Sequence, residues 1–206
     1  MNVKWIGAHS NNYGVGRNGN TITKVVMHWI VGTLSSADAT FNSPSRLASA
    51  HYGVGPTEIH QYVDENNTAW HAGNLLINMQ SIGIEHQGGP DLPIAEGTYK
   101  NSAMLLANIC KKHGIPLDRQ HVVLHREIKA TKCPGTLDVD RIISMAKAIN
   151  SSVVTTIEIT DQTKIDLAEF GIMEVQAIKS KMRADKAYSE KLENKLNQLK
   201  LIVNAN

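Results

Sequence analysis

The chain has 206 residues, and its 21 lysines and arginines nearly balance its 19 aspartates and glutamates. This length allows one good-sized domain, alone or with an appendage, and excludes a mini-protein held together by disulfides. A formal net charge of +2 gives no concentrated basic face, so we expect no nucleic-acid partner. The two cysteines make no disulfide framework.

The expected location follows from the apolar runs and from the first residues of the chain. No apolar run approaches the roughly 18 residues that a membrane span requires, so we expect no membrane insertion. Residues 1–5 lack the apolar stretch and the small-residue cleavage site of a signal peptide. We therefore expect the protein to stay in the cytoplasm of the producing cell until it is released.

The residue types are unevenly distributed along the chain. All nine histidines, both cysteines, all three tryptophans, all six prolines and fourteen of the fifteen glycines lie in residues 1–150. Residues 151–206 consist mostly of Lys, Glu, Asn, Ala, Ile and Leu. The sequence therefore predicts a domain over 1–150 that carries the candidate chemistry and a helical C-terminal region over 151–206.

The first half of the predicted domain alternates strand and helix patterns. Residues 23–31 are apolar and β-branched and predict a buried strand. Residues 35–49 have a helical rhythm of small and polar side chains. Residues 50–54 and 58–63 are short strand candidates, and the Gly-Pro turn between them predicts a hairpin.

The second half continues this alternation. In residues 81–85, the period of two places the isoleucines on one face and Glu85 on the other. A packed helix is predicted over 100–113, a short strand over 122–125 and a last helix over 138–149. Strands interleaved with helices predict an α/β layer fold.

Two histidines and a cysteine are candidate metal ligands. His28 and His125 each lie near the end of a predicted strand, and Cys133 follows eight residues after His125. Two imidazoles and a thiolate leave the fourth position of a tetrahedral zinc open for water, as a hydrolytic site requires. A thiolate also favours zinc over magnesium or calcium. Because the chain has nine histidines, the alternative is structural histidines beside a buried cysteine.

Five ordered motifs extend beyond these three residues. They are Val26–Trp29, Ser49–Tyr52, Thr68–Gly73, Ser81–Glu85, and His125–Glu127 together with Thr131–Gly135. Over about residues 20–148, their order and spacing resemble those of type 2 N-acetylmuramoyl-L-alanine amidases. These are the zinc enzymes of phage endolysins and bacterial autolysins, related to the peptidoglycan recognition proteins. The Ala-Trp-His-Ala-Gly and Thr-x-Cys-Pro-Gly elements are the most specific.

The resemblance implies a central mixed β-sheet flanked by helices. It implies hydrolysis of the amide between N-acetylmuramic acid and the first L-alanine of bacterial peptidoglycan, with His28, His125 and Cys133 as ligands of Zn²⁺. Glu85 matches the catalytic carboxylate, which relays a proton while zinc polarises the carbonyl and acidifies water. Some relatives carry a catalytic Tyr where this chain has Ala50, and that departure puts more weight on Glu85. The alternative for Glu85 is a solvated charge on a strand.

The resemblance also assigns residues around the metal. Relatives place a Lys or Thr two residues before the last ligand to stabilise the oxyanion, and here that residue is Thr131. We favour Thr131 over the adjacent Lys132, whose side chain turns away along an extended loop and meets substrate carboxylates or solvent. Trp70, His71 and Trp29 are candidate substrate-binding residues, with orientation of the site as a further role for His71 and packing as the alternative for all three.

Two other functions stay open. A recognition-type domain binds peptidoglycan fragments without cutting them, but such relatives commonly lack the thiolate that Cys133 supplies. A structural or assembly protein would use zinc for its fold and would not need Glu85. The sequence therefore favours an amidase, and the cytoplasmic expectation fits a phage endolysin that waits inside the cell until another factor opens the membrane.

The C-terminal region has a weaker pattern. Residues 153–159 are β-branched, and residues 161–201 predict a long helix. Within it, Leu192, Leu196 and Leu199 are spaced three and four residues apart, as in a short or broken coiled coil. This spacing favours a homo-oligomer that forms through the helix; the alternatives are attachment to a cell-wall component and a solvated amphipathic helix.

Overall fold

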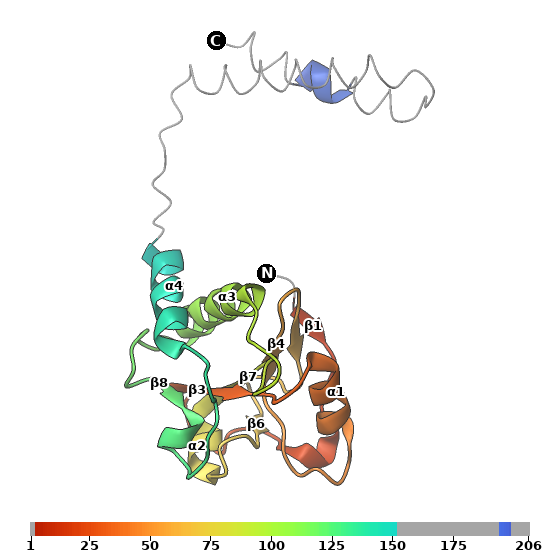
Figure 1. Ribbon diagram of the computed structural model, residues 1–206, viewed down its shortest axis with the longest axis vertical. Coiled ribbons are helices and arrows are strands. Elements are labelled where there is room, and N and C mark those ends of the chain that lie inside the picture. The colour runs from red at the N-terminus through yellow and green to blue at the C-terminus, as the bar shows by residue number, and fades with distance from the viewer. Residues whose placement is uncertain (1–2, 152–193, 199–206) are drawn as a thin grey trace. The chain divides into compact units, whose positions relative to one another are not determined.

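Figure 1 shows the computed structural model of the chain, which describes residues 3–151 and 194–198. The chain divides into two compact units, Met1–Ser152 and Val153–Asn206. In the second unit, residues 194–198 are helical and Leu196 is buried. The β-branched stretch over 153–159, and the predicted long helix outside 194–198, lie beyond the described residues. The role of the C-terminal region therefore stays a prediction.

A mixed sheet of six strands forms the centre of the first unit (Figure 1). In order across the sheet, the strands are β1 (Val3–Trp5), β5 (Ile59–Gln61), β4 (Tyr52–Val54), β7 (Ser81–His86), β3 (Lys24–Trp29) and β8 (Val122–Leu124). Strands β4 and β5 pair antiparallel as the predicted hairpin, and the other four neighbouring pairs run parallel. A separate antiparallel pair joins β2 (Tyr13–Gly14) to β6 (Thr68–Ala69). The predicted mixed α/β architecture is confirmed.

The main core lies between this sheet and two helices, α3 (Glu96–His113) and α4 (Val139–Ser151). The central strands contribute side chains that are fully buried: Val25, Met27, Ile82 and Ile84. Helix α3 ends at Gly114, whose φ of 66° is left-handed, a conformation that glycine adopts without steric cost. Both helices agree with the elements that the apolar spacing predicts.

The other side of the sheet carries two further helices, α1 (Leu34–Asn42) and α2 (Leu75–Gln80). Helix α1 packs through Ala37 and Phe41 into a second, smaller cluster of buried residues. Because side chains alternate along β7, the isoleucines enter the main core and Glu85 turns to this other side. Among the described residues, no helix is long and apolar enough to cross a bilayer.

Several elements end earlier than their patterns predict, and α1 and β8 are two of them. The helix expected over 35–49 ends at Asn42, because Pro44 disfavours helical geometry at Ser43, which is extended with φ −75° and ψ 120°. Strand β8 ends one residue before His125, which instead opens a 3₁₀ turn. The turn brings the His125 ring against the His28 ring of β3.

Candidate metal centre

The three candidate ligands meet at one edge of the sheet. His28 lies in β3, which pairs in parallel with β7 on one side and β8 on the other. Met27 pairs with Leu124 in the parallel register of β3 and β8. His28 and His125, which follow these two residues, therefore lie at the same edge of the sheet. Cys133 returns to this edge from the loop after the 3₁₀ turn, although it is 105 positions from His28 in the sequence. The parallel register therefore assembles the predicted ligand set.

The donor atoms of the three side chains converge closely. One atom from each of His28, His125 and Cys133 lies within 4.8 Å of the other two. His28 Nδ1 is 3.7 Å from Cys133 Sγ, and the centroids of the two imidazoles are 4.4 Å apart. Ordinary zinc bond lengths in a tetrahedron place a nitrogen and a sulfur ligand about 3.6 Å apart. The cluster is therefore the right size for a single zinc ion.

The two histidines are available as neutral ligands. Burial, reinforced by the neighbouring His71 and His125 rings, holds the pKa of His28 well below its usual value. Burial also lowers the pKa of His125, while the backbone carbonyl of Ala72 accepts a hydrogen bond from its ring. The His125 Nε2 atom is buried without a hydrogen-bond partner. A buried, unpartnered imidazole nitrogen fits a metal ligand, because a metal supplies the partner that the protein does not.

The thiol completes a soft donor set. Burial, together with the neighbouring Glu85, raises the pKa of Cys133 to about 12. The backbone N–H of Trp29 and the charge of Arg126 act in the opposite direction, but their effect is smaller. A bound cation reverses this preference and holds the thiolate, so metal binding would release the proton. Two imidazoles and one thiolate suit zinc and do not suit magnesium or calcium. The residues therefore fit the predicted ion.

Glu85 stands beside these three ligands on the neighbouring strand. The register of β3 and β7 pairs it directly with His28. It is partly buried, its Oε2 has no hydrogen-bond partner, and burial raises its pKa to about 8 although the charge of Arg46 opposes the shift. A carboxyl group that exchanges its proton near neutral pH suits acid–base chemistry. The alternative of a solvated strand charge does not fit this burial. We call His28, His125, Cys133 and Glu85 the metal cluster.

The loop that carries Cys133 is held from two sides. Thr131 Oγ1 accepts a hydrogen bond from the Cys133 N–H at 3.2 Å, and the Gly135 N–H donates to the Lys132 carbonyl at 2.7 Å. The Trp29 ring lies against Gly135, where a Cβ atom would collide with it. The structure thus places Trp29 against the ligand loop, while the side chains of Thr131 and Lys132 are exposed. Their catalytic roles stay predictions.

The two residues of the Trp-His pair lie differently. Trp70 is half-buried, its backbone exchanges hydrogen bonds with Ser49, and its ring lies near Gly14. His71 lies against the metal cluster: its Nδ1 is 3.1 Å from His28 Nε2 and its Nε2 is 3.3 Å from Ser81 Oγ. Both ring nitrogens of His71 therefore have partners within the protein.

Sequence reasoning missed several neighbours of the cluster. Ser81 and Asn78 contact the His71 segment, Arg46 acts on Glu85 through its charge, and Lys129 lies over Gly73. A signal existed for Ser81, because the alternation of β7 places it on the same face as Glu85. The others lie in loops or a short helix, where no periodic pattern points to a site.

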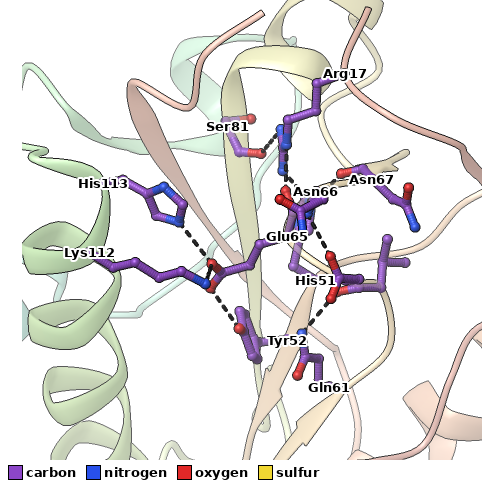
Figure 2. A network of polar contacts seen from close by, with 12 residues as sticks. Arg17, His51, Tyr52, Gln61, Glu65, Asn66, Asn67, Ser81, Lys112 and His113 are labelled. Atoms are coloured by element: carbon purple, nitrogen blue, oxygen red, sulfur yellow. Dashed lines mark hydrogen bonds and ion pairs between the residues drawn. The ribbon is translucent and has the colours of Figure 1, made fainter.

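A second polar cluster lies elsewhere in the same unit (Figure 2). Glu65, whose side chain is 7% exposed, accepts hydrogen bonds from Tyr52 at 2.7 Å, Lys112 at 2.6 Å and His113 at 2.8 Å. Burial alone would raise the pKa of Glu65, but these donors lower it below its usual value. The buried Arg17 donates to the Glu65 carbonyl at 2.6 Å. We call Glu65, Tyr52, Lys112 and His113 the Glu65 network.

Comparisons with curated proteins agree with the sequence motifs. The family described as N-acetylmuramoyl-L-alanine amidase matches residues 18–136, a range that contains the whole metal cluster. N-acetylmuramoyl-L-alanine amidase A of Achromobacter lyticus is 36% identical over 115 residues, which cover 54% of this chain and 63% of that protein. The amidase CwlH of Bacillus subtilis (strain 168) is 31% identical over 136 residues, 62% of this chain and 53% of that protein. The chain thus spans less than two thirds of the length of either relative.

Comparison with solved structures supports the fold. The catalytic domain of XlyA matches with a TM-score of 0.59 at 25% identity, covering 71% of this chain and 99% of that chain. An AmpD derivative shares the fold with a TM-score of 0.59 at 22% identity, covering 69% of this chain and 93% of that chain. Because the family match extends over more than half of the sequence, the chain belongs to the N-acetylmuramoyl-L-alanine amidase family.

Proposed function

We propose that the chain is a zinc-dependent amidase that hydrolyses the bond between N-acetylmuramic acid and the first L-alanine of bacterial peptidoglycan. The observation that carries the proposal is a three-ligand cluster with donor atoms within 4.8 Å of one another, beside a carboxylate with an unpartnered buried oxygen. A zinc site that only stabilised the fold would not need that carboxylate. The substrate follows from membership of the family and from the names of the relatives.

The proposed chemistry divides between the ligands and the acid. His28, His125 and Cys133 would hold the ion, which when bound would polarise the scissile carbonyl and acidify the attacking water. Glu85 would accept the proton of that water at Oε2 and pass it to the amide nitrogen as the C–N bond breaks. Burial raises the pKa of Glu85 in the metal-free site, and a bound cation beside it would lower that pKa toward the ionised form that accepts a proton.

The surrounding residues have supporting roles in this proposal. Thr131 uses its oxygen to accept the Cys133 N–H, which leaves the hydroxyl proton available to an oxyanion. Lys132, exposed on the same loop, is the alternative donor or a contact for stem-peptide carboxylates. The partly exposed faces of Trp29 and Trp70 are the proposed stacking surfaces for the substrate.

The test is the digestion of purified bacterial cell wall by the wild type, Cys133→Ser and Glu85→Gln. We expect the wild type to release L-alanine amino termini without new reducing sugars, and both variants to lose this release. Cys110→Ala controls for loss of a thiol, because Cys110 is buried in the main core away from the cluster. Equal release by all three proteins would contradict the site. Binding of wall fragments without release by any would favour the recognition-type alternative.

A phage endolysin that acts on the host wall after release is the biological role that we propose. It rests on the resemblance of the catalytic motifs to those of endolysins, and it implies that the protein stays in the cytoplasm of the producing cell before lysis. Fractionation of producing cells over time tests this role. Protein found outside intact cells before any membrane damage would contradict it.

For the C-terminal region, the proposed role is self-association, with attachment to the cell wall as the alternative. The support is the spacing of Leu192, Leu196 and Leu199 in the sequence. Light scattering on the full chain and on Leu196→Lys tests it. A larger mass for the wild type than for the variant is expected, and two identical monomers would remove the proposal.

A further inference from the structure

We infer that the segment His71–Ala72 is the outer support of the metal centre and determines which nitrogen each histidine ligand turns toward the ion. In this arrangement His28 binds through Nδ1 and His125 through Nε2. The inference rests on the proposed zinc site. Of the two roles that the sequence suggested for His71, substrate contact and orientation of the site, it selects the second and makes His71 a positioning residue.

The first support is a chain of hydrogen bonds from His28 to the backbone of α2. His28 Nδ1 is the nitrogen that faces Cys133 Sγ, so binding through Nδ1 leaves the ring proton on Nε2. That proton is donated to His71 Nδ1, 3.1 Å away. His71 must then carry its own proton on Nε2, which donates to Ser81 Oγ at 3.3 Å. The Ser81 hydroxyl in turn donates to the Ile77 carbonyl at 2.5 Å.

This series of hydrogen bonds allows only one arrangement of protons on the two histidines. If His28 instead turned Nε2 to the ion, its N–H would lie at Nδ1, and the contact with His71 would be lost. If His71 carried protons on both nitrogens, two donors would face each other at 3.1 Å. The hydroxyl of Ser81 therefore sets the tautomer of His71, and His71 sets the tautomer of His28. Such partners fix the orientation of a metal ligand and raise its basicity.

The second support acts on His125 through the next residue. The Ala72 carbonyl accepts a hydrogen bond from the His125 ring, and the unpartnered nitrogen of that ring is Nε2. The backbone of this segment is itself fixed, because Asn78 Oδ1 accepts from the His71 N–H at 3.2 Å and from the Ala72 N–H at 2.8 Å. Asn78 is 5% exposed. One buried amide therefore holds the segment that positions both imidazole ligands.

The third support is the packing of the His71 ring. It lies directly on Gly83 of β7, where a Cβ atom would come within 2.5 Å of His71 Cγ. The buried His51 ring packs beside it, with centroids 5.8 Å apart and the planes at 68°. A ring that lies on a glycine and has both nitrogens engaged is held in one orientation. A side chain that bound substrate would need a polar atom to spare.

The experiment measures zinc affinity by competition with a chromophoric chelator, which does not depend on activity. Relative to the wild type, His71→Ala is expected to bind zinc roughly 10- to 100-fold more weakly. His71→Asn is expected to stay within a few-fold, because Asn Oδ1 replaces the Nδ1 acceptor. Gly83→Ala, which displaces the ring without removing it, is expected to weaken binding as His71→Ala does. His121→Asn is the control, because this half-buried histidine pairs locally with Asp118.

A second readout identifies the nitrogens directly. In the zinc-loaded wild type, long-range ¹⁵N–¹H correlation spectra are expected to show His28 with its proton on Nε2 and His125 with its proton on Nδ1. The opposite tautomer at His28, or an unchanged zinc affinity in a folded His71→Ala protein, overturns the inference and leaves the proposed function standing. A raised KM in that variant with unchanged zinc affinity also overturns it and restores the substrate contact. If the wild type binds no zinc, the proposed function falls first and the inference falls with it.

Discussion

The metal cluster and the Glu65 network are both built from buried titratable side chains, yet they differ in how their polar atoms are paired. In the network, one carboxylate receives three donors and its pKa is lowered. In the cluster, Glu85 Oε2 and His125 Nε2 are buried without partners, and the pKa of Glu85 is raised to about 8. A buried polar atom without a partner costs free energy of folding. Two such atoms at one place therefore indicate a functional site, where a ligand or substrate supplies the missing partner.

This difference in pairing indicates that the Glu65 network stabilises the fold, whereas the metal cluster serves the chemistry. The Glu65 network ties the end of α3 to the segment after β5 and has its charges satisfied by the protein itself (Figure 2). The cluster is complete only with an ion and a substrate. We therefore expect substitutions in the first region to change stability and substitutions in the second to change activity.

The largest expected effect is the loss of catalysis in Glu85→Gln. The amide keeps the size of the side chain and removes the proton transfer, so the rate of amide release is expected to fall roughly 10²- to 10⁴-fold. Zinc content and the midpoint of unfolding should stay close to those of the wild type. Release assays with metal analysis check this. A folded, zinc-loaded variant with wild-type release would show that another group moves the proton.

The next effect is expected in Glu65→Ala, which should lose stability and keep its activity. Removing the acceptor leaves the buried Tyr52 hydroxyl unpartnered, and we expect a loss of about 2–3 kcal/mol in the free energy of unfolding at pH 7. The contribution from the exposed Lys112 is small because solvent screens it. Since the pKa of Glu65 is lowered by folding, the difference from the wild type should shrink as the pH falls through the carboxylate range.

Urea unfolding at several pH values measures this effect, and the release rate per folded molecule should be unchanged. Lys112→Met is the matched comparison, because it removes one partner and leaves the acid and the tyrosine in contact. A Glu65→Ala protein that is fully stable but inactive would erase the distinction between the two regions.

A smaller effect is expected from metal removal. An ion that binds the folded chain alone stabilises it by about 2.7 kcal/mol when its free concentration is a hundred times its dissociation constant. A chelator should therefore lower the melting temperature of the wild type and leave that of Cys133→Ser unchanged. Calorimetry with and without the chelator measures both. A drop of equal size in both proteins would place the stabilising ion elsewhere.

A pH dependence of stability is expected for the metal-free protein, in which no bound cation favours the Glu85 carboxylate. Folding raises the pKa of Glu85 from 4.5 to about 8, so the folded state holds a proton that the unfolded state has lost between these values. Stability of the metal-free wild type should accordingly decrease as the pH rises from about 5 to 8. Glu85→Gln should lack this slope, whereas an identical slope in the variant would assign the proton to another group.

The sequence predicts the parts of the site that depend on local patterns. The alternation in residues 81–85 places Glu85 on the face away from the core, and the strand pattern in residues 23–31 places His28 near a strand end. The ordered motifs point to His125 and Cys133 as the other ligands. The mixed sheet follows from the alternation of strands with helices and from the family resemblance.

The support of the site could not be predicted, because it depends on contacts between segments that are distant in the chain. The bond between His28 and His71 joins positions 43 residues apart, and it exists only once β3 and β7 are paired. The Glu65 network joins positions up to 48 apart, and each of its members looks like an ordinary surface residue in the sequence. The early end of α1 at Asn42 is a local effect of Pro44 that the helical rhythm conceals.

The position of Arg17 bears on how far the site can be moved to another protein. Its guanidinium Nη1 donates to the carbonyls of Asn78, Met79 and Ser81 at the end of α2, where a helix leaves carbonyls unpaired. Arg17 therefore closes the helix that presents Asn78 to the segment holding both imidazoles. A graft of the five motifs onto a new scaffold would bring every ligand and still lack this anchor. The smallest transferable unit of the metal centre thus includes an arginine that never touches it.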